Sequence, residues 1–242
     1  MLHLFSKKPK WIPTPNFGER KGGVRPSMIV LHYTDTQDTQ EALDYMMNPV
    51  REVSAHYVVE KDGQVIQMVK DEKRAWHAGK AYWRGERDIN SYSIGVEIVN
   101  SGHTYGHEPF PEVQIEMVVR LCKRVMKKWG IEASGVLGHS DVAPGRKEDP
   151  GHLFPWQRLA EQGIGIWPEP TAGDFEAAAG ILAQNGGFSG LLRQIGYDPD
   201  AGKEERVLAF HRRFYPEKFG SGEDASVVDV VSVAKALGVL RS

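Results

Sequence analysis

The chain has 242 residues, of which 40% are hydrophobic and 26% charged, a balance typical of a globular protein rather than a disordered or fibrous one. This length allows one large domain, or a medium domain followed by a small one. The formal net charge of −2 argues against a general electrostatic grip on nucleic acid or on an anionic membrane. No apolar run approaches the roughly 18 residues that are needed to span a bilayer.

The amino-terminal segment Met1–Lys10 carries basic residues but no apolar stretch that leads to a small-residue cleavage site. We therefore expect a cytoplasmic protein, and a periplasmic location stays open in case a leader precedes this sequence. Cys122 is the only cysteine, so the chain can form no internal disulfide. Its place in a helical pattern predicts a buried structural thiol.

Residues 28–162 show strand and helix signals in alternation. Short apolar runs predict strands at 28–34, 55–60, 64–69, 93–99 and 136–137, the second and third joined by a turn at 61–63. Helical patterns cover 39–47, 112–129 and 155–162. The polar, aromatic and glycine-containing stretch 71–90 predicts a long surface loop, and long loops are usually functional.

The character of the chain changes after a proline- and glycine-containing stretch at 163–170, which predicts a linker. Beyond it, three helical patterns cover 175–184, 204–215 and 227–240, with a short helical turn near 190–195 and no strand signal. We therefore expect a domain that spans 1–170, linker included, and a small all-α three-helix domain at 171–242.

The histidines are the first candidates for a metal site, because a catalytic zinc site needs three protein ligands and an open position for water. We expect His3, His107 and His211 at the surface, and His103 in a loop. Taken alone, His32 at a strand end reads better as a satisfied core histidine than as a ligand. His139 is similar, but the rigid segment that follows it can bring Asp149 back toward it, and a mere connection does not explain that segment.

Five motifs in this order resemble the zinc-dependent N-acetylmuramoyl-L-alanine amidases, which share a fold with peptidoglycan recognition proteins and amidase-type phage lysozymes. They are Val-Leu-His-Tyr-Thr (30–34), Ala-His-Tyr-Val-Val (55–59), Ala-Trp-His-Ala-Gly (75–79), Ser-Ile-Gly-Val-Glu (93–97) and Gly-His-Ser-Asp-Val-Ala-Pro-Gly-Arg-Lys-Glu-Asp-Pro-Gly (138–151). The resemblance covers about residues 10–168. It implies an α/β fold in which helices surround a central mixed β-sheet.

By motif position, His32, His139 and Asp149 match the family's ligands for one zinc ion per chain. Many relatives carry a cysteine as the third ligand, whereas this chain has Asp149, as in the bacterial muropeptide-processing branch. Cys122 lies in a predicted helix far from that motif and is no substitute.

The reaction that the resemblance implies is hydrolysis of the amide between N-acetylmuramic acid and the L-alanine of the stem peptide. Glu97 matches the catalytic glutamate, and a carboxylate within a buried strand is costly unless it has a function. Lys147 matches the residue that stabilises the developing oxyanion, although a solvated loop lysine would be the default without the motif.

Further residues have two open interpretations each. His56 and His77 resemble groove-lining or supporting positions, or are hydrogen-bonded structural histidines. Trp76 stacks on a sugar face or packs the loop. Arg146 and Arg87 could meet the carboxylates of a peptide stem, though Arg87 could equally belong to the surface.

The carboxy-terminal part resembles the small three-helix peptidoglycan-binding domains that follow amidase domains in some bacterial enzymes. It either binds glycan or serves only as a packing module. The expected partners are muropeptides or peptidoglycan fragments, in cell-wall turnover or recycling, and the anhydro or intact form of muramic acid stays open, as does the oligomeric state. The alternatives are a recognition protein that binds peptidoglycan without cutting it and a phage-type lysin that acts on intact wall.

Overall fold

A computed structural model describes residues 8–222 and 224–242, and the chain in it divides into two compact units. The first consists of the described residues up to 79 together with 90–131, and the second of residues 80–89 together with 132–242. His3 lies outside the described residues. So does most of the amino-terminal segment Met1–Lys10, on which the expected cytoplasmic location was based. Within the described ranges, no helix combines the length and the apolar character that a membrane crossing requires.

The first unit is built on a mixed β-sheet. Its central strands are parallel and six residues long, because each is an almost continuous apolar run that suits burial on both faces. The adjacent hairpin adds an antiparallel pair, as the turn at 61–63 predicted. Five hydrogen-bonded strands follow one another in this unit in the order β1 (Lys10–Trp11), β5 (Val65–Gln67), β4 (Tyr57–Val59), β7 (Ser93–Ile98) and β3 (Met28–Tyr33).

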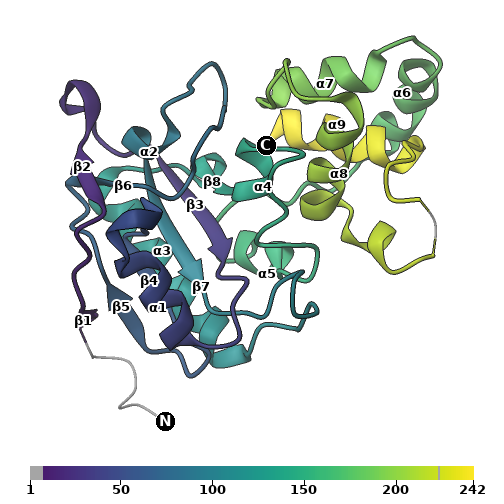
Figure 1. Cartoon of the computed structure of the whole chain (residues 1–242). Helices are drawn as coiled ribbons and strands as arrows, with labels where there is room; N and C mark the ends of the chain where they lie inside the picture. Colours follow the sequence, from purple (N-terminus) through teal and green to yellow (C-terminus); the bar gives the residue numbers. More distant parts are fainter. Residues whose placement is uncertain (1–7, 223) are drawn as a thin grey trace. The chain divides into compact units, whose positions relative to one another are not determined.

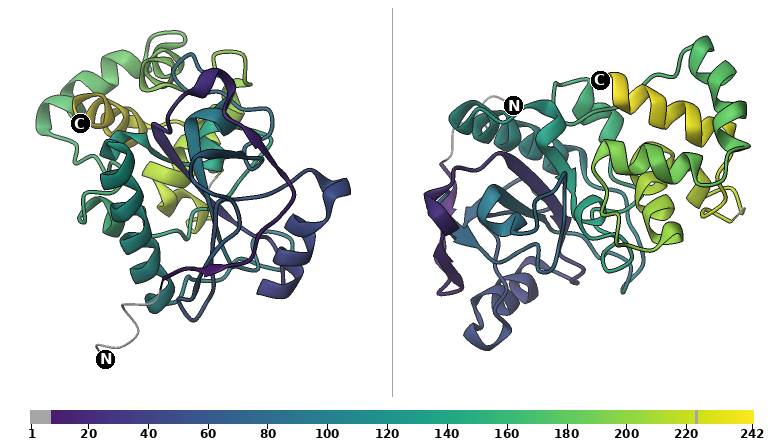
Figure 2. Two further views of the ribbon diagram at one scale, coloured as in Figure 1. Left: turned by 90° about the vertical axis from the view of Figure 1, so that its left-hand side faces the viewer. Right: turned by 90° about the horizontal axis from the view of Figure 1, so that it is seen from above.

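Two helices cover the opposite faces of this sheet (Figures 1 and 2). α1 (Thr39–Met47) begins where the Asp38 carboxylate accepts a hydrogen bond from the Glu41 backbone N–H, and it buries Leu43 and Met46 in the core. α3 (Glu112–Trp129) ends at Gly130, whose φ of 71° only glycine adopts without strain. Its apolar stripe includes Cys122, which is fully buried and whose thiol pKa burial raises to about 12.

The stretch 71–90 differs from the prediction of a surface loop without regular structure. β6 (Lys73–Ala75) lies in it and pairs antiparallel with β2 (Phe17–Glu19), and the helical turn α2 (Ile89–Tyr92) begins at its end. Ala75, His77 and Ile89 are buried. The polar composition of this stretch suggested exposure to solvent. Polar side chains such as that of His77 are nevertheless buried here, because they have hydrogen-bond partners.

The longer segment of the second unit starts with a strand and short helical turns: β8 (Val136–Gly138), α4 (His139–Val142) and α5 (Trp156–Ala160). Four longer helices follow, namely α6 (Ala172–Leu182), α7 (Gly187–Ile195), α8 (Lys203–Phe214) and α9 (Val230–Arg241). Three of them match the predicted helical patterns, and the expected short turn is the nine-residue helix α7. They pack around buried Phe188, Leu192 and Phe210. The predicted domain boundary near residue 170 stays a prediction.

His211 in α8 corrects an expectation. It is fully buried rather than at the surface, with Nδ1 2.6 Å from the carbonyl oxygen of Ala225 and Nε2 2.9 Å from Ser232 Oγ. Its polar sequence neighbours hid an inward position on the helix. His107 is exposed, as predicted.

Candidate metal centre

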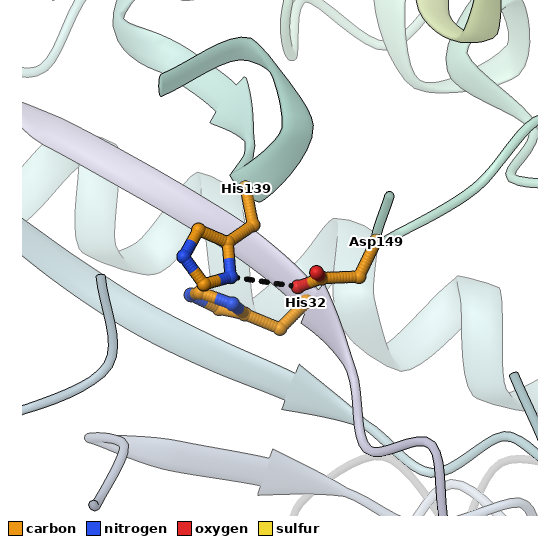
Figure 3. Close-up of side chains that lie close together, drawn as sticks. All are labelled: His32, His139 and Asp149. Atoms are coloured by element: carbon orange, nitrogen blue, oxygen red, sulfur yellow. Dashed lines mark hydrogen bonds and ion pairs between the residues drawn. The ribbon is translucent and has the colours of Figure 1, made fainter. Parts of the chain in front are cut away.

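Three buried side chains converge on one point (Figure 3). His32 comes from β3, His139 is the first residue of α4, and Asp149 lies on the loop after α4. Each offers a ligand atom, and these atoms all lie within 4.8 Å of one another. Two imidazole nitrogens and one carboxylate form a donor set that suits zinc and leaves coordination positions for water or substrate. The cluster is therefore compatible with a metal site.

The loop that carries two of these residues closes on itself. We call residues 139–149 the ligand loop. The backbone N–H of Ser140 donates to the carbonyl oxygen of Asp149 at 2.9 Å, and His139 Nδ1 lies 3.0 Å from Asp149 Oδ2. Arg146 Nη2 lies 3.3 Å from His139 Nε2, and Arg146 Nε donates to the Lys80 carbonyl oxygen at 3.1 Å. The segment thus brings Asp149 against His139, as its sequence predicted.

A histidine supports His32 from the other side. His32 Nε2 lies 3.1 Å from Nδ1 of the buried His77, and His77 Nε2 lies 3.1 Å from Ser93 Oγ. The backbone N–H of His77 donates to Asn90 Oδ1 at 3.0 Å. A hydrogen bond on one ring nitrogen of a ligand histidine fixes its orientation and its tautomer, and this leaves Nδ1 of His32 as the nitrogen for a metal. Of the two interpretations of His77, the geometry favours support of His32.

Glu97 lies beside His32 through strand register. The two residues are partners in the parallel ladder of β3 and β7, so their side chains leave the same face of the sheet. Glu97 is half-buried as a residue, and its Oε2 is buried. A carboxylate at this place is near the candidate ligand, which is one requirement for a general base.

His56 is fully buried and held by other groups. Its Nδ1 accepts a hydrogen bond from the Gly95 backbone N–H at 3.0 Å, and its Nε2 lies 3.0 Å from the Lys73 carbonyl oxygen and 3.2 Å from Arg20 Nη2. Burial, with the nearby Arg20 charge, lowers the pKa of His56 to about 4. These contacts fit the interpretation as a hydrogen-bonded structural histidine.

The remaining predicted residues lie in different surroundings. Lys147 is exposed on the ligand loop. Arg87 forms ion pairs with Asp198 at 3.2 Å and Asp200 at 2.6 Å, so its guanidinium is already engaged within the chain. Trp76 is half-buried, and its backbone N–H donates to Ser54 Oγ at 2.9 Å.

One polar network went unpredicted. Asp141, two residues after His139, is fully buried and accepts hydrogen bonds from the Gly138 backbone, the Tyr197 hydroxyl and the Arg213 guanidinium. The local sequence around Asp141 is polar and gives no signal of burial, and its side-chain partners Tyr197 and Arg213 lie more than 50 residues away.

The fold and the cluster define an α/β protein with a candidate metal centre, and comparison with known proteins identifies the class. The family model "N-acetylmuramoyl-L-alanine amidase" matches residues 22–152. The Escherichia coli N-acetylmuramoyl-L-alanine amidase AmiD is 34% identical over 88% of this chain and 82% of its own length. The chain therefore belongs to the N-acetylmuramoyl-L-alanine amidase family and is an amide hydrolase of that class, which confirms the family that the motifs predicted.

Solved structures agree with this assignment. E. coli AmiD in complex with anhydro-N-acetylmuramic acid-L-Ala-D-γ-Glu-L-Lys has a TM-score of 0.76 and 29% identity, over 93% of this chain and 97% of that one. AmpDh3 from Pseudomonas aeruginosa in complex with anhydromuramic pentapeptide has a TM-score of 0.77 and 26% identity, over 98% of this chain and 96% of that one. They confirm the predicted fold class, a central mixed sheet flanked by helices.

Proposed function

We propose that this chain hydrolyses the amide bond between N-acetylmuramic acid and the L-alanine of the stem peptide, with one zinc ion held by His32, His139 and Asp149. The observation that carries the proposal is the convergence of these three ligand atoms within 4.8 Å. The register partnership of Glu97 with His32 supports it, because a general base belongs beside the metal.

The chain's own residues supply the proton transfers and part of the charge stabilisation. When bound, a zinc ion supplies Lewis acidity, which polarises a carbonyl and makes water more acidic. Glu97 takes a proton from the attacking water and passes it to the departing amine of alanine. Lys147 stabilises the negative charge that develops on the carbonyl oxygen. His77 and Ser93 keep the ring of His32 in place, through contacts of 3.1 Å each.

The substrate that we propose is a muropeptide with 1,6-anhydro-N-acetylmuramic acid, in cell-wall turnover or recycling. The support comes from the AmiD and AmpDh3 complexes, both of which contain an anhydromuramoyl peptide and match more than 90% of this chain. We propose further that helices α6–α9 correspond to the peptidoglycan-binding-like domain predicted at 171–242.

The test is product analysis by mass spectrometry. The zinc-loaded protein is incubated separately with intact peptidoglycan and with a soluble anhydromuramoyl peptide, and its zinc content is measured in parallel. We expect about one zinc ion per chain and release of free stem peptide from the soluble fragment. Release from both substrates would broaden the proposed specificity to the polymer. Bound zinc without release from either substrate would refute hydrolysis and favour a recognition protein.

A further inference from the structure

The buried carboxylate of Asp141 links the ligand loop to the carboxy-terminal helices. Asp141 Oδ1 accepts a hydrogen bond from the Tyr197 hydroxyl at 2.8 Å. Its Oδ2 accepts from Arg213 Nη1 at 2.5 Å and from the Gly138 backbone N–H at 2.7 Å. Arg213 Nη2 donates to the carbonyl oxygen of Val136 at 2.9 Å, in the strand that leads to His139. Four hydrogen bonds thus fix the backbone on both sides of His139.

A second arginine of α8 contacts the other end of the ligand loop. Arg212 Nη2 lies 3.2 Å from Glu148 Oε1, and Glu148 immediately precedes Asp149. Between the two ends of the loop, Gly145 lies close to Glu205 of α8: a Cβ added to Gly145 would lie 2.5 Å from Glu205 Cγ. Neighbouring residues of one helix therefore hold the loop next to both of its candidate ligands.

The connection between α7 and α8 holds the neighbouring loop 80–89 as well. The Tyr197 ring packs edge-on against buried Trp83, with ring centroids 5.2 Å apart. The backbone N–H of Arg84 donates to the Gly196 carbonyl oxygen at 3.0 Å, and Arg84 Nε donates to the Ile195 carbonyl oxygen at 3.0 Å. Gly196 has a φ of 136°, and an added Cβ would lie 2.6 Å from Arg84 Cγ, so glycine is required for this approach.

Simple packing does not require this chemistry. A buried ion pair such as Asp141–Arg213 is often no more stabilising than apolar residues of the same volume, whereas its directional hydrogen bonds favour a single geometry. Asp141 is 0% and Arg213 3% exposed, so solvent scarcely weakens the constraint. Burial raises the pKa of Tyr197 well above its usual value, so its hydroxyl stays protonated and donates.

We propose that Tyr197 and Arg213 are positioning residues for the metal centre, and that the carboxy-terminal helices thereby form part of the amidase site in addition to any binding of glycan. They act through Asp141 on the orientation of His139 and, with Arg212, on the distance between His139 and Asp149. This inference rests on the proposed zinc site. It adds a role for the carboxy-terminal helices, for which the sequence indicated only glycan binding or packing.

The test compares Tyr197→Phe with the control Arg193→Gln in the full chain. Tyr197→Phe removes one hydroxyl and keeps the ring that packs against Trp83, whereas Arg193 is an exposed residue of α7. Zinc affinity is measured by chelator competition, and the absorption spectrum of the cobalt-substituted protein reports ligand geometry. We expect Tyr197→Phe to weaken zinc binding about tenfold and to alter the cobalt spectrum, since loss of supporting contacts costs 10–100-fold in affinity.

Hydrogen exchange of the metal-free protein provides an independent measurement. We expect faster exchange in residues 139–149 of Tyr197→Phe, with unchanged exchange in α9. Zinc affinity within twofold of wild type together with unchanged loop exchange would overturn the proposal, and so would uniformly faster exchange, which indicates global destabilisation. If the wild type binds no zinc, the proposed function fails, and loop exchange still decides whether Tyr197 positions the loop. Arg213→Lys extends the test, since partial retention of affinity is expected from a shorter reach with the charge kept.

Discussion

At the scale of single residues, Asp149 is the candidate ligand with the clearest expected effect. Asp149→Ala removes one of three ligand atoms, and a catalytic zinc site needs all three. We expect the zinc content to fall from about one ion per chain to near zero, with the loss of amidase activity. Elemental analysis after dialysis measures the first and stem-peptide release the second. An exposed-carboxylate control, Glu161→Gln, should change neither. Zinc retained at wild-type content in Asp149→Ala would contradict the ligand assignment.

Glu97 separates chemistry from metal binding. Glu97→Gln keeps the shape of the side chain and removes its ability to take a proton. We expect wild-type zinc content and a decrease in kcat of about 10²–10⁴-fold, the range typical of a lost general base. Steady-state kinetics on an anhydromuramoyl peptide, with zinc analysis of the same sample, measures both. Turnover within tenfold of wild type would show that Glu97 is not the base.

The oxyanion role of Lys147 competes with a simpler interpretation, because an exposed loop lysine ordinarily serves only solubility. Lys147→Met removes the charge that would stabilise the oxyanion, and we expect kcat to decrease about 10²-fold with little change in KM. Lys147→Arg should recover part of the lost rate. If both variants keep the wild-type kcat, the loop lysine is only solvated and the oxyanion role is wrong.

The residues of the candidate metal cluster, and Glu97 beside it, could be singled out from the sequence because each lies in a motif of contiguous residues. Their supporting contacts could not. His32 and His77 are 45 residues apart, and Asp141 and Arg213 are 72 apart. Nothing in the local pattern near either residue indicates which distant side chain it meets. Arg87 illustrates the same limit, because its partners Asp198 and Asp200 lie in the carboxy-terminal helical region.

At the scale of elements, local signals predicted α1 and α3 to the residue, whereas they missed β2 and β6. Each helix has a residue with a strong capping preference at one end, Asp38 before α1 and Gly130 after α3. β2 and β6 are three residues each and exist only through pairing with one another across more than 50 residues. Short strands of this kind carry too few residues for a periodic pattern.

A close approach within the first unit gives an element-scale prediction. Gly95 lies in β7 where an added Cβ would collide with the His77 ring, 2.8 Å from Nδ1. Gly95→Ala therefore displaces His77, which in turn contacts His32. We expect the free energy of unfolding to decrease by about 1–3 kcal/mol, as overpacking typically costs, and zinc affinity to decrease. Denaturant titration and chelator competition measure the two effects.

Gly180 provides the matched control for this change. It lies in α6 with no atom within 4 Å of an added Cβ, so Gly180→Ala should raise helix stability by about 0.5–1 kcal/mol. Zinc affinity should not change in this variant. Wild-type stability and zinc affinity in Gly95→Ala would mean that β7 and His77 can separate, and that His77 does not hold His32 rigidly.

At the scale of the whole molecule, the stability of the fold depends on pH through His56. Burial, with the Arg20 charge, lowers the pKa of His56 from 6.5 to about 4 in the folded chain. The unfolded chain therefore binds a proton more readily as the pH falls below about 6.5, and folding loses free energy down to about pH 4. The two pKa values correspond to a loss of about 3 kcal/mol between pH 7 and pH 4 from this residue.

His56→Gln isolates this contribution, because glutamine does not titrate in this range while its amide oxygen can still accept a hydrogen bond. We expect the variant to be less stable than wild type at pH 7 and to lose less stability on acidification. Urea denaturation at several pH values between 7 and 4 measures how the free energy of unfolding changes with pH in each protein. The metal-free protein is used so that pH-dependent release of zinc does not contribute to this change. Parallel slopes would show that His56 is already protonated or reaches water in the folded chain, and that the buried Arg20–His56 arrangement does not make the fold acid-sensitive.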